Sequence, residues 1–389
     1  MPNWTLERTL GFLPYAVFIA TFQRSVVAPM LLGMGQDFDV NLATITLSMS
    51  AYLLAYGLAQ PVWGIISDRL GRTATLRLSL VLAGVLDLVS VIPMDIGPFI
   101  AFRALAGAMM AGVFPTAVIF IGDTISEPRK RQPAIAHLQI GVAMALTFGT
   151  VLGGIGIATI GWQAFFIATS LVCFIMAIYV KGMPNPKPGI HRLPVLRSFQ
   201  VVLSNGWSWL LFGLVFFEAA VLLGVFALVP AALETTGSSA IIAGLVTGGY
   251  GLSVLVTSQV VRKRAQHVHP HRFLFYGGSA SIIGFAILAV SVNAWTVFIS
   301  VCFQGIAWVL MHTTLQTWAT SLSDKARAMA VSLFAGSMFL GNGAGAYAAS
   351  HLLEFSGTVT LFSIASLTMV ALTVVSVAAQ RHYSHRTAS

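Results

Sequence analysis

The sequence predicts an all-α polytopic membrane protein with twelve transmembrane helices in two pseudo-symmetric six-helix bundles. Three observations lead to this fold class. Hydrophobic residues make up 57% of the 389 residues and charged residues only 8%, with a mean hydropathy of +0.86, far outside the usage of soluble globular domains. Long apolar runs recur along the chain. Basic residues gather in alternate connections between these runs.

Each spanning helix is predicted from an apolar run of roughly 20 residues, the length that crosses the hydrocarbon core of a bilayer. The first run is too long for a secretion signal and lacks a basic leader with a small-residue cleavage site, so no cleavable signal is expected. Twelve runs fit, near residues 10–33, 42–66, 74–93, 97–121, 134–158, 162–182, 207–232, 239–261, 273–292, 295–319, 329–351 and 357–380.

The placement of Lys and Arg predicts the orientation, because cytoplasmic loops collect basic residues. Of the 21 basic residues, 19 lie in the termini or in even-numbered connections. Both termini should therefore face the cytoplasm, in a multi-pass protein of the cell membrane, which in a bacterium is the inner membrane. The net charge of +9 is scattered over short segments, so no nucleic-acid-binding face is expected. The odd-numbered connections carry only the acids Asp37, Asp39, Asp95, Glu234 and Glu354.

The turn between the second and third predicted helices carries the most specific motif. It reads Gly64-Ile-Ile-Ser-Asp68-Arg69-Leu-Gly71-Arg72. Its glycines allow sharp bending and close helix approach, and its charges at a membrane surface must meet water or partners. The motif resembles the G-x-x-x-D-R-x-G-R signature between helices 2 and 3 of the major facilitator superfamily of secondary transporters. A basic turn that only obeys the positive-inside rule is the simpler alternative.

The resemblance implies a gating network at the cytoplasmic face. In the family, the acid and the last arginine of this motif join an acid at the end of helix 4, which here are Asp68, Arg72 and Asp123, with Arg131 as a further partner. We expect these ion pairs only in the outward-facing state, so that protonation or substrate binding shifts the population. The matching turn of the second half, residues 262–264, has lost its acid. The predicted cytoplasmic gate is therefore asymmetric between the two halves.

Residues 183–206 form the longest connection and a Pro-rich one, so they are predicted to be a cytoplasmic linker. The linker divides an N-terminal bundle, 1–182, from a C-terminal bundle, 207–389, which ends in a short basic tail. An offset of 194 residues places Tyr56 over Tyr250, with other weak matches. Parallel repeats of this kind in the superfamily hold the substrate site at their interface near the midplane.

Two opposite charges fall at matching depths of the two halves. The same offset places Arg24, in predicted helix 1, over Glu218, in predicted helix 7. A charge at the bilayer centre costs at least about 2.5 to 3.5 kcal/mol, so each such residue is a functional candidate. Glu218 and Arg24 are therefore candidates for proton coupling or substrate contact. A fixed salt bridge that joins the halves is the structural alternative.

A second buried pair is predicted in helices 3 and 4. Asp87 and Arg103 each lie eight residues from Asp95, so on an antiparallel hairpin they reach similar depth and can pair. Arg103 also begins an R-x-x-x-G sequence that resembles the helix 4 motif of 12-helix drug:proton antiporters, although Ala106 replaces the usual Gln. In that family the arginine is associated with proton transfer. Proton coupling and structural pairing both stay open.

Helix 5 carries a further partial motif. Gly149, Thr150, Gly153 and Gly154 resemble the antiporter signature G-P-x-x-G-G, with Thr150 in place of the proline. The glycines are expected to let helix 5 pack closely against a neighbour across the interface between the halves. Small-residue packing is common in any membrane bundle, which is the alternative.

Polar and aromatic side chains of helices 1, 2, 7 and 10 are the candidates for a substrate cavity. An aromatic cavity with few polar anchors suits amphipathic small molecules. Aromatic residues at helical spacing also face lipid, and a histidine in a helix is more often a satisfied hydrogen-bonding group than a ligand. The candidates are Phe22, Gln23, Arg24, Tyr52, Phe217, Glu218, Gln304, Trp308 and His312.

The resemblance implies a secondary active transporter that exports an amphipathic small molecule by alternating access while protons move inward. A transporter of a specific anionic metabolite is the alternative, indicated by Arg24 where many antiporters carry an acid. A non-transporting receptor is a remote third reading. The sequence shows no P-loop, metal cluster or hydrolase triad, so no enzyme activity, cofactor or metal is expected. The expected partners are a small-molecule substrate, protons and the lipid bilayer, and the chain is expected to act as a monomer.

Overall fold

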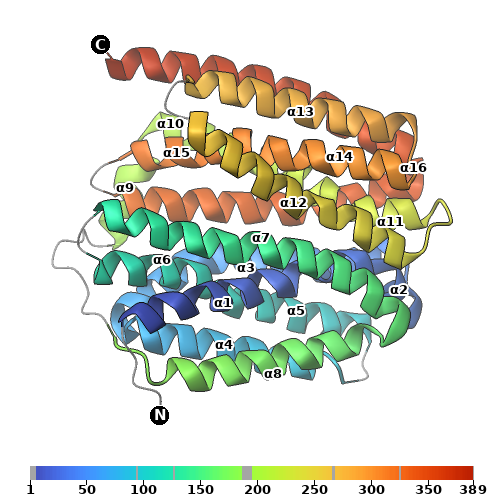
Figure 1. Ribbon diagram of the computed structural model, residues 1–389, viewed down its shortest axis with the longest axis horizontal. Helices are drawn as coiled ribbons and strands as arrows, with labels where there is room; N and C mark the ends of the chain where they lie inside the picture. Colours follow the sequence, from blue (N-terminus) through green and yellow to red (C-terminus); the bar gives the residue numbers. More distant parts are fainter. Residues whose placement is uncertain are drawn as a thin grey trace. The chain divides into compact units, whose positions relative to one another are not determined.

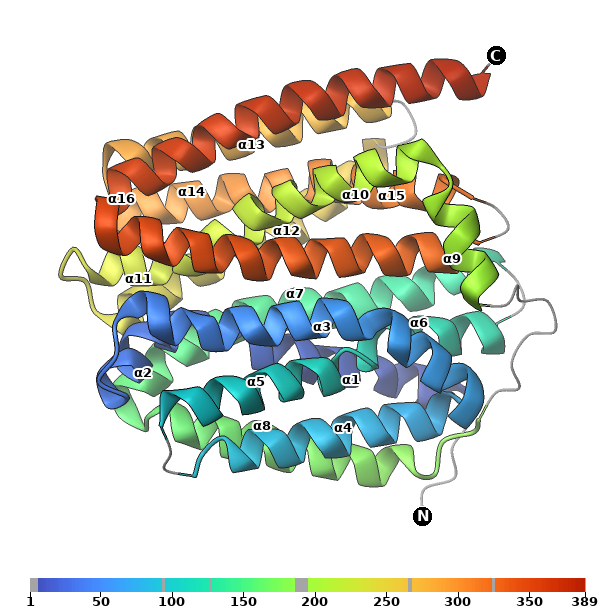
Figure 2. The ribbon, with the colours of Figure 1, turned by 180° about the vertical axis from the view of Figure 1, so that it is seen from behind.

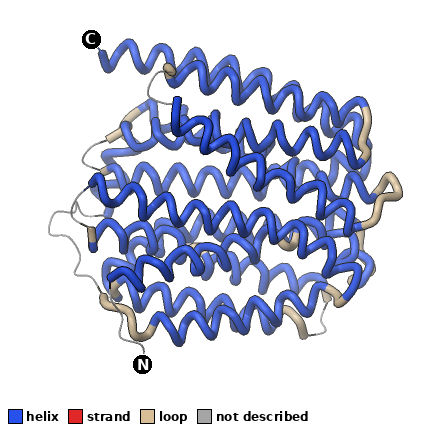
Figure 3. The backbone as a smooth tube through the Cα atoms, in the orientation of Figure 1, coloured by secondary structure: helices blue, strands red, loops and turns tan. Residues whose placement is uncertain are grey.

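The computed structural model describes residues 6–92, 95–125, 128–185, 195–264, 268–323 and 326–388. All regular structure within these ranges is helical (Figure 3). The chain divides into two compact units, Met1–Gln200 and Val201–Ser389, coloured from blue to green and from yellow-green to red in Figure 1. The boundary falls inside the predicted linker, 183–206, where a short amphipathic helix, α9 (Val195–Leu203), also lies.

Unit 1 contains six membrane helices, two of which are interrupted. The first breaks after α1 because Pro29 has no backbone N–H to continue the helical hydrogen bonds, and a short 3₁₀ turn follows. The fourth breaks at Ala111 and Gly112. In chain order the helices are α1 (Leu6–Ser25) with α2 (Leu31–Asp37), α3 (Leu42–Leu70), α4 (Arg72–Val89), α5 (Ile96–Met110) with α6 (Val113–Thr124), α7 (Pro128–Thr159) and α8 (Trp162–Val180).

Unit 2 repeats this plan with two π-helical segments, Ala220–Val225 and Trp308–His312. Its last two membrane helices are continuous in α16 except at Gly357, where φ is +76°, a backbone conformation that glycine adopts without steric cost. In chain order the helices are α10 (Gly206–Ala219) with α11 (Val229–Glu234), α12 (Ala240–Arg264), α13 (Pro270–Val290), α14 (Ala294–Ala307) with α15 (Thr313–Ser321), and α16 (Arg327–Ala388).

The predicted twelve-helix fold is confirmed. Ten helical stretches of the described residues are long and apolar enough to cross a membrane. The last of them contains predicted helices 11 and 12, joined at Gly357. The remaining predicted helix is α4, which is less apolar because Arg72, Arg77 and Asp87 put three charges into its 18 residues.

The glycine-bearing face of α7 packs against the first helix of the same unit, and Figures 1 and 2 show α1 and α7 side by side. A Cβ atom at Gly153 would lie 2.6 Å from the Val26 carbonyl oxygen and 2.6 Å from Pro29 Cγ. At Gly149 a Cβ atom would meet the Ser25 hydroxyl. At Gly149 and Gly153 the described neighbour is therefore the first helix of unit 1, whereas the sequence predicts a neighbour across the interface between the halves. The break after α1 brings the backbone of the first helix against this face. Gly154 is buried, and its packing partner stays a prediction.

Candidate functional site

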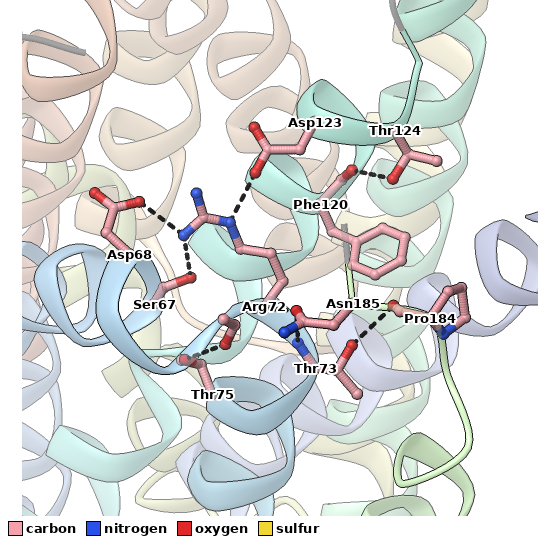
Figure 4. A network of polar contacts seen from close by, with 11 residues as sticks. Ser67, Asp68, Arg72, Thr73, Thr75, Phe120, Asp123, Thr124, Pro184 and Asn185 are labelled. Atoms are coloured by element: carbon pink, nitrogen blue, oxygen red, sulfur yellow. Dashed lines mark hydrogen bonds and ion pairs between the residues drawn. The ribbon is translucent and has the colours of Figure 1, made fainter. Parts of the chain in front are cut away.

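Arg72 connects three membrane helices of unit 1 (Figure 4). Its Nη1 lies 2.8 Å from Asp68 Oδ1 and donates to the Ser67 hydroxyl, and its Nε donates to Asp123 Oδ2 at 2.8 Å. The exposed fraction of the side chain is 0% for Arg72, 6% for Asp123 and 37% for Asp68. Loss of a partner is costly in a buried pair, whereas an exposed pair contributes little. Asp123 is therefore the main counter-charge of Arg72.

The turn beneath this network is held by the segment that follows α8. Gly71 has φ of +87°, which suits glycine, and it is the single residue between α3 and α4. The Arg72 backbone N–H donates to the side-chain carbonyl of Asn185 at 2.9 Å, and the Thr73 hydroxyl donates to the Pro184 carbonyl at 2.9 Å (Figure 4). A Cβ atom at Gly71 would also collide with the Asn185 amide. The sequence assigns Asn185 to the linker and does not reveal this role.

The other predicted gating residues contribute less to this geometry. Gly64 lies in α3 with open space around it, and Arg69 is exposed. The side chain of Arg131 lies outside the described residues. Every described contact of Arg72 lies within unit 1, so the structure brings the predicted charges together while their gating role stays a prediction.

A second charge cluster lies in the core of unit 1. Asp87 and Arg103 are both buried, and Arg103 Nη1 lies 2.8 Å from Asp87 Oδ1. The second carboxylate oxygen of Asp87 accepts hydrogen bonds from the Gln23 amide and, at 3.4 Å, from the Thr169 hydroxyl. Gln23, a predicted substrate contact, is thus engaged by Asp87. Thr169 is a polar residue in the otherwise apolar α8, the sixth predicted membrane helix. This is the sequence signal that could have revealed it as a further partner of Asp87.

Aromatic rings enclose the arginine of this cluster. The Arg103 guanidinium carbon lies 4.6 Å from the centre of the Tyr52 ring and 4.8 Å from the centre of the Phe166 ring. Such cation–π contacts are strengthened by the absence of water. Tyr52, a predicted substrate contact, therefore packs on Arg103 in the described structure.

Replacing Asp87 by Asn should destabilise the protein, because the Arg103 charge would stay buried without its counter-charge. The expected loss is about 3 to 5 kcal/mol in the free energy of unfolding, measured by chemical unfolding of the purified protein in detergent. The matched control is Asp95→Asn, since Asp95 is exposed and its side chain makes no capping hydrogen bond; its effect should stay within about 0.5 kcal/mol. Equal losses in the two variants would contradict the prediction.

In unit 2, Glu218 forms a buried pair with His312. Glu218 Oε2 lies 2.9 Å from His312 Nδ1. The Trp308 ring stacks on the imidazole with centroids 3.8 Å apart, and Phe334 lies 5.3 Å away. Glu218 Oε1 has no hydrogen-bond partner among the described residues. The carboxyl group is thus buried and contacts a titratable imidazole.

Both π-helical segments of the structure adjoin this pair. Glu218 lies two residues before the segment Ala220–Val225, and His312 ends the segment Trp308–His312. Such segments often occur at functional sites, because they change which side chains a helix directs inward. Arg24, the predicted partner of Glu218, belongs to unit 1, so that pairing stays a prediction. Trp308 and His312 stack on each other, and His312 also contacts Glu218, while their role as substrate contacts stays a prediction.

The remaining predicted substrate residues do not gather in one described cavity. The Gln304 side chain accepts from the Ser281 hydroxyl at 2.8 Å and donates to the Ser281 carbonyl at 3.3 Å, so it joins α13 to α14. Phe217 is 55% exposed, and Phe22 is buried against Phe18. Gln304 is therefore a packing residue in this structure.

An apolar groove of about 800 Å³ lies on unit 1 between α1 and α7, beside the end of α6. The sequence does not reveal this groove, although its lining residues recur every three or four positions along both helices. That spacing is a usable signal only when the two helices are known to be neighbours. The lining consists of Leu10, Gly11, Pro14, Tyr15, Phe18, Ile125, Ala134, His137, Ile140, Gly141, Met144 and Phe148.

Comparisons with known proteins agree with this architecture. The sequence matches the Major Facilitator Superfamily over residues 15–321 and 216–388. The efflux pump dotC of Dothistroma septosporum is 27% identical over 208 residues, which cover 53% of this chain and 35% of that protein. A probable sugar efflux transporter of Pasteurella multocida is 22% identical over 378 residues, 95% of this chain and 91% of that one. The matches span only about a third to a half of the length of several other relatives.

The fold also resembles solved structures. A bacterial homolog of the human lysosomal transporter Spinster, in an inward-facing and unoccupied conformation, superposes with a TM-score of 0.76 at 16% sequence identity. The match covers 96% of this chain and 97% of that one. At this identity the likeness concerns the fold.

Proposed function

The chain belongs to the Major Facilitator Superfamily, and on this premise we propose that it is a secondary active transporter that exports an amphipathic small molecule in exchange for protons by alternating access. As a family member it is a multi-pass membrane protein. The direction of transport is supported by the names of two relatives, both of which describe efflux. The coupling and the substrate class are argued from the residues of this chain.

Proton coupling rests on the Glu218–His312 pair. An ionised carboxylate in a membrane helix requires a counter-charge, so the buried pair is balanced either by a protonated imidazole or by a proton on Glu218 itself. The two groups lie 2.9 Å apart, within reach of a direct proton exchange. The Trp308 ring stacks on the imidazole. A proton that enters or leaves therefore changes the net charge of a buried site, which is the requirement for coupling transport to a proton gradient.

The groove on unit 1 supports the substrate class. Its volume of about 800 Å³ lies within the range of small-molecule sites, about 300 to 1,000 Å³. Aromatic rings from Tyr15, Phe18 and Phe148 line it, together with Met144, whose side chain is polarizable and adaptable. His137 is one of its few polar groups. Apolar walls with a polar group at one place favour a ligand that is amphipathic.

Reconstitution in vesicles tests the proposal. With a pH gradient imposed, the fluorescent amphipathic dye ethidium should move against its own concentration gradient, and an ionophore that collapses the pH gradient should reduce movement to the rate of empty vesicles. Transport that is unaffected by the ionophore would exclude proton coupling. Movement of xylose or of an anionic metabolite without movement of the dye would favour another substrate class.

Filling the groove should block transport without unfolding the protein. A Cβ atom at Gly11 has no neighbour within 4 Å, so Gly11→Trp can direct an indole ring into the space that Gly11 lines. We expect dye binding to weaken by about tenfold or more, which corresponds to about 1.4 kcal/mol of lost contact, as measured by fluorescence titration. Gly213→Trp is the matched control, since Gly213 is equally open but belongs to α10. Equal weakening in both variants would contradict a role of the groove.

A further inference from the structure

Unit 2 carries a large excess of positive charge at its predicted cytoplasmic end. The sequence places eight Lys and Arg residues in the connections and the tail there, against one acid, Asp324, which lies outside the described residues. The other acids of unit 2 are Glu218, which is buried, and Glu234 and Glu354 in predicted outer connections. The sequence therefore predicts a strongly positive cytoplasmic end for this unit. The basic residues are Arg262, Lys263, Arg264, Arg272, Lys325, Arg327, Arg381 and Arg386.

Four basic side chains of this end come together from two helices. His271 and Arg272 lie in the first turn of α13. His269 is the residue before this helix, and its ring stacks on that of His271 with centroids 5.5 Å apart. His271 is close enough to Arg381, near the end of α16, to interact with its charge. Figures 1 and 2 show α13 running alongside the second half of α16. We call His269, His271, Arg272 and Arg381 the α13–α16 basic patch.

The end of α16 is held in position by aromatic contacts. Tyr383 packs edge-on against Trp207 at 5.4 Å between ring centroids, and its ring is tilted against Trp318 at 5.1 Å. Its hydroxyl donates to the Ser321 carbonyl at 3.2 Å. Arg381 lies two residues before this anchor, so its position relative to α13 is set by packing.

An exposed aromatic pair lies one helical turn deeper than the basic patch. Phe275 and Tyr276 follow Arg272 by three and four residues, which places all three on one face of α13. Phe275 is 53% exposed and Tyr276 is 55% exposed. Aromatic residues with this exposure are typical of the membrane–water interface, where an amphipathic ring meets the glycerol and headgroup region. Positive charge at the surface and aromatic rings below it match the charge and polarity of a phospholipid.

We propose that the α13–α16 basic patch binds the headgroup of an anionic phospholipid, with Phe275 and Tyr276 against its glycerol and upper acyl chains. Basic pockets between transmembrane helices on the cytoplasmic side recognise anionic headgroups, and each Lys or Arg near the surface adds attraction. A soluble anion would use the charges but would gain nothing from the exposed rings. An anionic phospholipid therefore accounts for both the basic side chains and the exposed aromatic rings. The proposal does not depend on which substrate is transported.

Native mass spectrometry of the whole purified protein in detergent tests this proposal. Phosphatidylglycerol should bind at a saturable site, and phosphatidylcholine should bind much more weakly. Arg272→Gln or Arg381→Gln alone should weaken phosphatidylglycerol binding about fivefold. The double variant should weaken it about 25-fold. Unchanged binding by the double variant would overturn the proposal.

The control must remove the same charge elsewhere on the same predicted side of the membrane. Arg77 and Arg197 are exposed arginines in predicted cytoplasmic segments of unit 1, and the double variant Arg77→Gln, Arg197→Gln should bind phosphatidylglycerol within about twofold of the original protein. An equal loss in this control would show that only net charge matters and would overturn the site. Displacement of the lipid by millimolar inorganic phosphate would assign the patch to a soluble anion and would also overturn the proposal. Thermal unfolding of each variant confirms that it is folded.

Discussion

Glu218→Gln should reduce gradient-driven transport to the rate of empty vesicles while the protein stays folded. Glutamine keeps the shape of glutamate and an oxygen that can accept from His312 Nδ1, which now lies 2.9 Å from the carboxylate. It cannot take up or release a proton. Movement of the dye down its own concentration gradient should therefore persist, and only the response to an imposed pH gradient should be lost. Proteoliposome assays with and without that gradient separate the two activities.

The matched control for this variant is Glu234→Gln. Glu234 ends α11, the outer part of the same interrupted helix, and it lies in a predicted outer connection, so its loss should leave the response to the gradient intact. His312→Gln adds a second comparison. If His312 exchanges the proton with Glu218 across their 2.9 Å contact, this variant should also lose the response. Full gradient-driven transport in Glu218→Gln would assign the pair a structural role.

Asp123→Asn should lower the free energy of unfolding much more than Asp68→Asn, although both carboxylates lie 2.8 Å from the Arg72 guanidinium. Asp123 is 6% exposed and Asp68 is 37% exposed. Removing the buried partner leaves the fully buried Arg72 charge poorly compensated, at an expected cost of about 3 to 5 kcal/mol in the free energy of unfolding. Removing the exposed partner should cost about 1 kcal/mol or less. Chemical unfolding in detergent measures both values.

The same pair of variants tests the predicted gate. If these ion pairs favour the outward-facing state, Asp68→Asn should shift the population several-fold toward the inward-facing state without greatly reducing stability. The readout is the labelling rate of a cysteine introduced at the outer mouth, in a background where Cys302 is replaced, since Cys173 is buried. An unchanged labelling rate would remove the gating role. Equal stability losses for Asp68→Asn and Asp123→Asn would show that burial does not decide the strength of the two contacts.

Depth in the membrane was the property that sequence reasoning predicted well. The twelve apolar runs match helices, and Asp87 and Arg103, placed at equal depth by counting from Asp95, form a direct ion pair. The contact between Arg72 and Asp123 follows from the family motif and the topology. In each case, chain length and hydropathy determine how far along the bilayer normal a residue lies.

Neighbouring faces were the property that sequence reasoning could not predict. The sequence did not indicate that Glu218 contacts His312 within unit 2, while a contact with Arg24 stays a prediction. Gly149 and Gly153 meet the first helix of their own unit, and Asn185 binds a turn more than a hundred residues away.

The sequence by itself determined the number of helices, their order and the depth of their charged residues, because each follows from local hydropathy and the rise per residue of a helix. The motif turn between α3 and α4 was determined in the same local way. Only the tertiary structure decided which face of each helix meets a neighbour, and with it the Glu218–His312 pair, the groove between α1 and α7 and the α13–α16 basic patch. The physical reason is that lipid tails are as apolar as a protein core. A membrane helix can therefore be hydrophobic on all sides, and its periodicity does not separate the packed face from the face exposed to lipid.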